Sequence, residues 1–408
     1  MKANPLSAQS LPGLRFASVI QLEGAQLPLL LHVPLERLVA YACSESSCGL
    51  IPMQVDERDA AGRWVLDQGP TTNVDDEPGR LDANDMVMFY ASDGGSLPPA
   101  HGLPEAPALY QVSIRDPLDG SMRYIYLVAQ RQPRTESLAS YVHYDPTNDR
   151  AEGRHVGLGY AAGVPGYLSV DDGVNLLDRL KVRADASFLF GLIHFTRSEA
   201  DLQTQVSGWR AGPIRIVRGQ EQRVRLGWGI RSPTFVSYTF FYRDFAELPV
   251  GFRLNFPPTY FFSGIHVRVV LDFRDLRGWQ VEVPGNGRTF AVDGSMNADK
   301  RALSQRGDKW IALRGPETTL LQGIELSPSL ASVRRRLWYR ESLSAGDPPE
   351  DFPGELPGVG YGLDHWEEVS AGLIWLQATS YALPADVDVA QFVDALQRPL
   401  DVQVRPYP

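Results

Sequence analysis

Cysteine is scarce in this chain of 408 residues, which contains only Cys43 and Cys48. A structural zinc site needs four ligands, so two cysteines without a second pair give no reason to expect one. The two lie five positions apart in the stretch ACSESSCG, which can bend to disulfide geometry. We expect a Cys43–Cys48 disulfide and an oxidising compartment, with two free thiols of a cytosolic protein as the alternative.

Long hydrophobic runs are also missing, since no stretch approaches the about 20 apolar residues of a membrane span. The best local run, 27–33, contains Pro28 and is followed by Pro34. The first residues, MKANPLSAQSLPGLRF, have no hydrophobic signal core and resemble the end of a mature chain. Together with the expected disulfide, this predicts no membrane span and a periplasmic or secreted location.

Positive charge is in deficit, with 39 Lys and Arg against 49 Asp and Glu and a net charge of -10. That balance argues against binding to nucleic acid or to anionic membrane. The chain also lacks a G-x-S-x-G nucleophile elbow, a phosphate-binding loop, a dinucleotide fingerprint, H-E-x-x-H and C-x-x-C-H. Nothing therefore favours nucleotide, haem or zinc-protease chemistry, and no cofactor is expected apart from calcium.

Turn residues and short strands are what the sequence does contain. With 37 Gly and 31 Pro, the chain is punctuated as turn-rich all-β proteins are. Helical periodicity is clear only in 388–397, where Val389, Phe392, Val393 and Leu396 share one face before Pro399. We therefore predict an all-β protein with one short C-terminal helix.

Three regions follow from the spacing of the strands. Residues 1–134 read as a small β-barrel-like unit, 135–172 as a long irregular connection, and 173–408 as a large antiparallel β-sandwich. Strands are expected in the first region near 15–22, 29–33, 51–56, 86–91, 108–114 and 123–128. In the third region, the clearest hairpin is expected at 214–230.

Two segments of the first region carry a resemblance. IPMQVDERD and LDANDMVMFYASDGG resemble a signature of uncharacterised bacterial exported proteins. They are also similar to small β-barrel modules that precede sandwich domains in polysaccharide-degrading proteins. Where many such sequences have Glu, this one has Met86. The resemblance covers about a tenth of the chain, implies export and a β-module, and carries over no catalytic residue. The matching residues are Ile51, Pro52, Gln54, Asp56, Asp82, Asp85, Phe89, Asp93 and Gly94.

An acidic loop between the expected strands is the candidate metal site. Hard oxygen ligands in such density suit Ca²⁺, although the spacing is not that of an EF-hand. The alternative is a solvated turn whose side chains cap local backbone N–H groups. The candidate ligands are Asp75, Asp76, Asp82, Asn84 and Asp85.

Arginine and aromatic residues interleave in 209–243. In the expected hairpin, Arg215, Arg223 and Arg225 alternate with apolar residues and so point to one side, with Tyr242 and Arg243 nearby. Such a face could bind an acidic polysaccharide or an acidic protein surface. The alternative is an outer sheet face whose arginines pair internally with the surplus of carboxylates.

Catalytic pairs are harder to find. We considered His194 with Arg197, His266 with Tyr260, the run 242–244 and the run 364–368, none of which has diagnostic spacing. The sequence therefore favours an exported, non-enzymatic binding or accessory protein for a glycan or a protein partner. The alternative is a carbohydrate-active enzyme, a polysaccharide lyase or glycoside hydrolase, with its site on the large sandwich.

Overall fold

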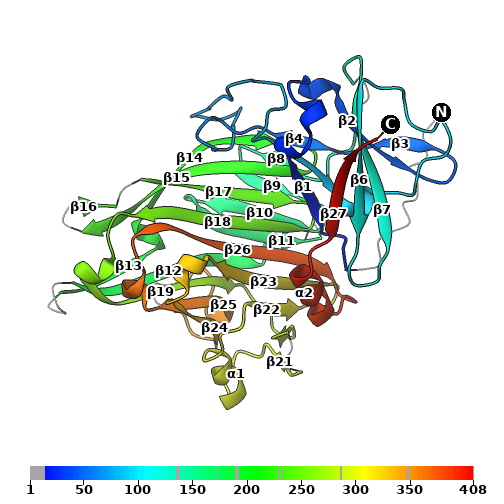
Figure 1. Cartoon of the computed structure of the whole chain (residues 1–408). Coiled ribbons are helices and arrows are strands. Elements are labelled where there is room, and N and C mark those ends of the chain that lie inside the picture. The colour runs from blue at the N-terminus through cyan, green and yellow to red at the C-terminus, as the bar shows by residue number, and fades with distance from the viewer. Residues whose placement is uncertain are drawn as a thin grey trace. The chain divides into compact units, whose positions relative to one another are not determined.

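The computed structural model shows an all-β protein, as the sequence predicts (Figure 1). In the described part, every helix is too short or too polar to cross a bilayer. The chain divides into two compact units. The first contains Met1–His143, Arg210–Ile216 and Ala390–Pro408, and the second contains Tyr144–Trp209 and Val217–Val389. The structure describes residues 14–134, 138–171, 173–188, 193–227, 230–232, 234–284, 287–346 and 350–407.

Two antiparallel sheets build the first unit, and Figure 1 shows the C-terminal strand in red beside the cyan strands. One sheet has the order β1 (Val19–Glu23), β5 (Met86–Tyr90), β4 (Gln54–Asp56). The other has the order β27 (Asp401–Pro406), β6 (Ala108–Arg115), β7 (Met122–Ala129), β2 (Leu38–Cys43), β3 (Cys48–Ile51).

The core of the first unit follows from strand alternation. Apolar side chains at every second position point to one face, and those of both sheets meet in one buried cluster. Val87 and Phe89 of β5 and Val112 and Ile114 of β6 belong to it. The expected strand at 29–33 is wrong. Pro28 instead begins the short 3-10 helix η2 (Pro28–Leu30), because its fixed φ suits a first helical position.

The C-terminal helix is confirmed as α2 (Val389–Gln397). Phe392 on this helix is fully buried and stacks on Phe16, with ring centroids 5.5 Å apart. After it, β27 pairs with β6, so the end of the chain belongs to the first unit and not to the region 173–408. A second helix, α1 (Ala298–Leu303), has Asn297 as its N-cap. The Asn297 side chain accepts a hydrogen bond from the backbone N–H of Lys300.

A β-sandwich forms most of the second unit. Its five-stranded sheet has the order β13, β12, β19, β25, β24, and a ten-stranded sheet lies opposite (Figure 1). The strands of the first sheet are β13 (Ile193–Ser198), β12 (Leu177–Phe188), β19 (Phe262–Phe273), β25 (Glu355–Asp364) and β24 (Arg334–Ser342). Those of the second are β14 (Leu202–Ala211), β15 (Arg215–Gly227), β17 (Phe235–Tyr242), β18 (Phe245–Leu254), β26 (Gly372–Pro384), β23 (Thr318–Leu326), β22 (Trp310–Arg314), β20 (Gln280–Glu282) and β21 (Thr289–Ala291), with β16 (Ile230–Arg231) paired to β15.

Two expectations for this region differ from the structure. The stretch 135–172, expected to be an irregular connection, contains a four-stranded sheet of β8 (His143–Asp145), β9 (Arg150–Glu152), β10 (Val156–Ala161) and β11 (Val164–Val170). The hairpin expected at 214–230 is instead the continuous strand β15. Gly219 has no positive φ and makes no turn, because β14 and β17 pair with β15 on both sides.

Candidate functional site

The predicted arginine and tyrosine residues do not form one surface. Arg215, Tyr242 and Arg243 are buried, whereas Arg223 and Arg225 are exposed on β15. In the first unit, the Arg215 Nε donates to Asp56 Oδ2 at 2.7 Å. In the second unit, Arg243 Nε donates to the adjacent Asp244 at 2.8 Å. Internal carboxylates thus neutralise two of the arginines, and only Arg223 and Arg225 face solvent.

The Q-x-D part of the N-terminal signature has a structural role. Gln54 Oε1 accepts the backbone N–H groups of Ile214 and Arg215, both at 2.9 Å, and its Nε2 donates to Asp56 at 2.7 Å. Asp56 in turn binds the Arg215 guanidinium, which also lies over the Trp64 ring at 4.5 Å from its centroid. Gln54 and Asp56 therefore anchor the segment Arg210–Ile216 within the first unit.

The acidic loop brings part of the predicted metal set together. One carboxylate oxygen each of Asp75, Asp82 and Asp85 lies within 4.8 Å of the others. Asp85 is fully buried and accepts backbone N–H groups of Arg58 and Asp82 at 3.0 and 2.9 Å. Burial raises the pKa of Asp85 to about 7, against these hydrogen bonds, and repulsion from Asp82 adds to the rise.

Two oxygens of this loop remain without a donor among the described residues. They are Asp75 Oδ2 and Asn84 Oδ1, both buried. Burial also raises the pKa of Asp75. Asp76, by contrast, is exposed. Capped backbone groups fit the turn interpretation, while the two unsatisfied oxygens beside a carboxylate cluster are what a hard cation would coordinate.

An arginine-rich surface lies on the outer face of the five-stranded sheet in the second unit. We call it the arginine face and define it by Arg183, Arg268, Arg336, Trp338 and Arg340. Along its middle run Gly358, Gly360 and Gly362 of β25. The strand register places Arg268 and Arg336 on either side of Gly362, and Trp338 beside Gly360. The three glycines contribute no side chains of their own, and all three are buried between the neighbouring strands.

Arg268 is the distinctive residue of the arginine face. Its guanidinium lies over Trp338, 4.1 Å from the ring centroid, and no described carboxylate lies within 4.0 Å of its nitrogens. Burial lowers the pKa of Arg268, and repulsion from nearby Arg183 lowers it further. An arginine held on an aromatic ring with no carboxylate in contact can donate hydrogen bonds to an anion.

The other arginines of this face have internal partners. Arg183 Nη1 lies 2.6 Å from Glu199 Oε2, and Arg340 Nε lies 3.2 Å from Glu355 Oε2. Arg336 donates two hydrogen bonds to Asp364. Among the described residues, this leaves Arg268 as the member of the set with no carboxylate in contact, while Asp185 and Glu355 act on its charge from a longer distance.

The expected run 364–368 lies at the edge of the arginine face. Asp364 Oδ1 lies 2.9 Å from His266 Nδ1. Burial would raise the pKa of Asp364, but hydrogen bonds from Arg336 and His266 hold it below its usual value. From the sequence, both His266 and this run are candidates, but nothing pairs them. The register of β19 and β25, which makes them cross-strand neighbours, is not readable from either segment.

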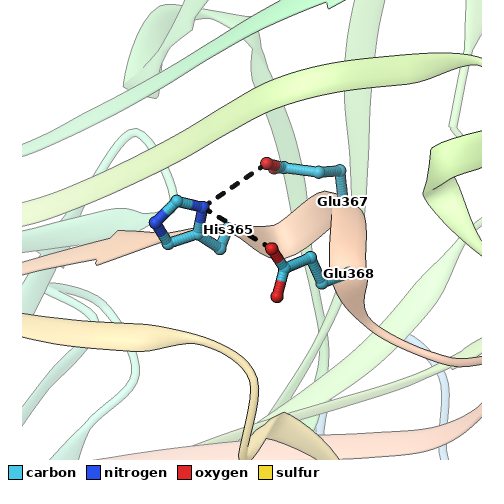
Figure 2. Close-up of side chains that lie close together, drawn as sticks. All are labelled: His365, Glu367 and Glu368. Carbon is cyan, nitrogen blue, oxygen red and sulfur yellow. Dashed lines mark ion pairs between the residues drawn. The ribbon is translucent and has the colours of Figure 1, made fainter.

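Beyond Asp364 the chain turns sharply into η8 (Trp366–Glu368). His365, at φ +66°, makes this turn, and Figure 2 shows its ring directed toward Glu367 and Glu368. The His365 Nδ1 lies 3.6 and 3.9 Å from a carboxylate oxygen of Glu367 and Glu368. These three side chains could hold a metal ion, but Glu367 also accepts the Ile265 N–H at 2.8 Å and the cluster is largely exposed.

Sequence reasoning missed the arginine face, although a signal for it exists. The segment RRRLWYR places Arg334, Arg336, Trp338 and Arg340 at alternate positions, and GVGYG does the same for three glycines. Both are strand patterns. Glycine is disfavoured inside a strand unless another group lies close to the backbone, so the glycine run by itself favours a loop.

Comparison with known proteins yields a similarity of fold. No family model matches the chain, and no curated protein matches it. A solved α-mannosidase from Enterococcus faecalis V583 matches with a TM-score of 0.51 at 8% identity, over 96% of this chain and 45% of that one. A glycosyl hydrolase family 38 protein from Enterococcus faecalis matches with a TM-score of 0.50 at 9% identity, over 95% and 45%. The chain thus spans less than half the length of these proteins, and at this identity the likeness concerns the fold alone.

Proposed function

We propose that this chain is an exported, non-enzymatic binding protein that recognises an anionic glycan through the arginine face. The observation that carries the proposal is Arg268, stacked on Trp338 beside Arg183 and without a described carboxylate at its guanidinium. A guanidinium fork binds a carboxylate or sulfate in two parallel hydrogen bonds.

Other observations support this proposal without testing it. A carbohydrate ligand agrees with the two structural neighbours, which are an α-mannosidase and a glycosyl hydrolase family 38 protein. The Cys43–Cys48 disulfide favours an oxidising compartment and therefore export. An acidic protein surface is the alternative partner, and it would bind the same guanidinium, that of Arg268.

Binding of polygalacturonate, measured by calorimetry at two salt concentrations, tests the proposal. We expect Arg268→Ala to weaken binding at least tenfold and Arg268→Lys to restore it only in part, because lysine has no planar fork. Arg223→Ala is the matched control, since Arg223 is an exposed arginine on the opposite sheet. If Arg268→Ala binds like the wild type, or if neutral dextran binds equally well, the arginine face is not an anionic-glycan site.

The enzymatic alternative has one observation in its favour, the close carboxylates of Glu367 and Glu368. A glycosidase needs one carboxyl group that stays protonated as the general acid. Burial would raise the pKa of Glu367, but hydrogen bonds from backbone N–H groups and from His365 hold it below its usual value, which suits a permanent anion. New reducing ends or unsaturated products from polygalacturonate, lost in Glu367→Gln, would establish the enzyme instead.

A further inference from the structure

A large apolar cavity lies between the two sheets of the sandwich. Its volume is about 480 Å³, within the range of roughly 300–1,000 Å³ of small-molecule sites. The lining positions alternate along each strand, as the inward faces of two opposed sheets must. Among them are Val182 of β12, Val267 and Val269 of β19, Val250 of β18 and Leu376 of β26.

Incomplete burial of these residues shows that the side chains of the two sheets leave a space between them. Val182, Val250, Val267, Val269 and Leu376 all face inward, yet each is only half-buried. In the first unit, the corresponding inward positions are almost fully buried. Protein interiors normally pack as densely as organic crystals. A void of this size therefore leaves its lining side chains without van der Waals contacts on the side that faces the void.

Polar groups of the lining are largely engaged with each other. Gln220 Nε2 donates to Ser237 Oγ at 3.1 Å, and Ser380 Oγ donates to Gln322 at 2.6 Å. Among the described lining residues, Arg197 of β13 is the one with a charged side chain. It lies opposite Ala184, which in turn lies opposite Val267, so Arg197 is toward one end of the lining positions of β19, which run from Ile265 to Leu271. The cavity thus combines a long apolar wall with one cation at an end.

We infer that this cavity binds a linear acyl chain, with an anionic head group at Arg197. An apolar cavity of about 150 Å³ in another protein binds benzene, and the volume here is roughly three times larger. Aliphatic side chains from both sheets offer few polar groups to a sugar but cover a hydrocarbon chain on two sides. The occupant is therefore a fatty acid or the acyl chain of a larger amphiphile. The site is separate from the arginine face, which lies on the outer side of the same five-stranded sheet.

Calorimetric titration of the full chain, freed of bound lipid, with dodecanoate tests this inference. We expect saturable one-to-one binding with a negative heat-capacity change, the mark of apolar burial. Ala378→Phe places a ring in the cavity and is expected to weaken binding at least tenfold. Gln377→Phe is the matched control, because Gln377 is the adjacent residue of β26 and points to the opposite face.

Arg197→Gln tests the position of the head group. It should weaken dodecanoate at least fivefold while leaving dodecyl maltoside, which has the same chain and a neutral head, unchanged. A twelve-carbon lysophosphatidylcholine then distinguishes a free fatty acid from an esterified chain. The inference is overturned if the wild type binds none of these chains saturably, or if Ala378→Phe binds them all as the wild type does. Should Ala378→Phe not fold, Ala184→Phe fills the same cavity from the other sheet.

Discussion

Cys43 and Cys48 are opposite each other in the register of β2 and β3, and their disulfide confirms the pairing that the sequence predicts. In the chain-entropy model, so small a loop contributes about 2 kcal/mol to the free energy of unfolding. We therefore expect Cys48→Ser to lower that free energy by about 2 kcal/mol in urea denaturation. Ser46→Ala in the same loop should change little. Two titratable thiols in the unfolded, unreduced wild type would contradict the disulfide.

Calcium binding by the acidic loop remains a prediction, and the geometry narrows it to Asp75, Asp82, Asp85 and Asn84. We expect millimolar Ca²⁺ to raise the melting temperature of the wild type, since a ligand that binds only the folded state stabilises it. Asp75→Asn should remove this rise, because Asp75 is buried with an unsatisfied oxygen. Asp76→Asn, at the exposed neighbour, should keep it. If Ca²⁺ leaves the wild-type melting temperature unchanged, the loop is a capped turn.

Arg215 and Arg268 show which property of a residue the sequence does not predict. The local sequence pattern, an arginine among apolar residues, is the same at Arg215 and at Arg268. The partner of Arg215 is Asp56, which lies 159 positions away in sequence, and this pair makes it structural. Arg268 has no such partner among the described residues, and its aromatic neighbour, Trp338, is on another strand. The sequence predicts that arginine faces exist, but the pairing that separates buried arginines from available ones is tertiary.

Strand β25 offers a test at the scale of an element. A Cβ at Gly360 would lie 2.0 Å from the backbone oxygen of Val269, whereas one at Gly362 would meet only the Arg336 Nη2 at 3.9 Å. We expect Gly360→Ala to lower the free energy of unfolding by about 1–3 kcal/mol through overpacking. Gly362→Ala should change it by less than about 0.5 kcal/mol. Equal effects in denaturant titrations would show that the glycine spacing is not set by close approach.

A buried charge cluster links β12, β19 and β25 at the other end of the same sheet. Lys181 Nζ lies 2.9 Å from Asp272 and 3.0 Å from Glu355, and it also contacts Glu350. Burial raises the pKa of Asp272 to about 8; Lys181 opposes this rise and Glu350 adds to it. The folded state then holds a proton that the unfolded state releases near pH 4.

Stability should therefore depend on pH in a defined direction. Because the folded pKa of Asp272 is the higher one, its stabilising effect is present at low pH and is lost as the pH rises from about 4 to about 8. Asp272→Asn should flatten the free energy of unfolding over this window. Asp275→Asn, at an exposed carboxylate whose pKa Arg277 lowers, is the control. An unaltered pH profile in Asp272→Asn would rule out this assignment.

Elements were predictable where the pattern is local. The helix at 388–397 and the strand at 108–114 carry complete periodicities, and the structure has them as α2 and β6. The expected strand at 86–91, apolar throughout, is β5. The run 29–33 is apolar without alternation, which does not distinguish a strand from a helical turn. The segment 214–230 is predicted as a hairpin, but pairing with neighbouring strands on both sides keeps β15 extended. Partners distant in sequence decide both cases.

At the scale of the molecule, the chain does not divide where its composition changes. The first unit takes in Arg210–Ile216 and Ala390–Pro408 from far along the sequence. Gln54 and Asp56 hold the former, and Arg15 holds the latter by donating to the carbonyl oxygens of Ala395 and Arg398. The sequence does not show that these two segments belong to the first unit, because a strand that pairs with a distant sheet has the same alternation as any other strand.

Ending the chain at Arg398 tests this organisation. The truncation removes β27, which pairs along the whole of β6, and the Tyr407 ring that contacts Tyr126 at 5.4 Å between centroids. We expect hydrogen exchange to accelerate in β6 and β7 while β12 and β19 keep the protection of the full chain, because the latter lie in the other unit. A second truncation, after Pro406, keeps β27 and should affect β6 far less. If both truncations leave β6 equally protected, or if exchange accelerates equally in β6 and β19, the C-terminal strand does not belong specifically to the first unit.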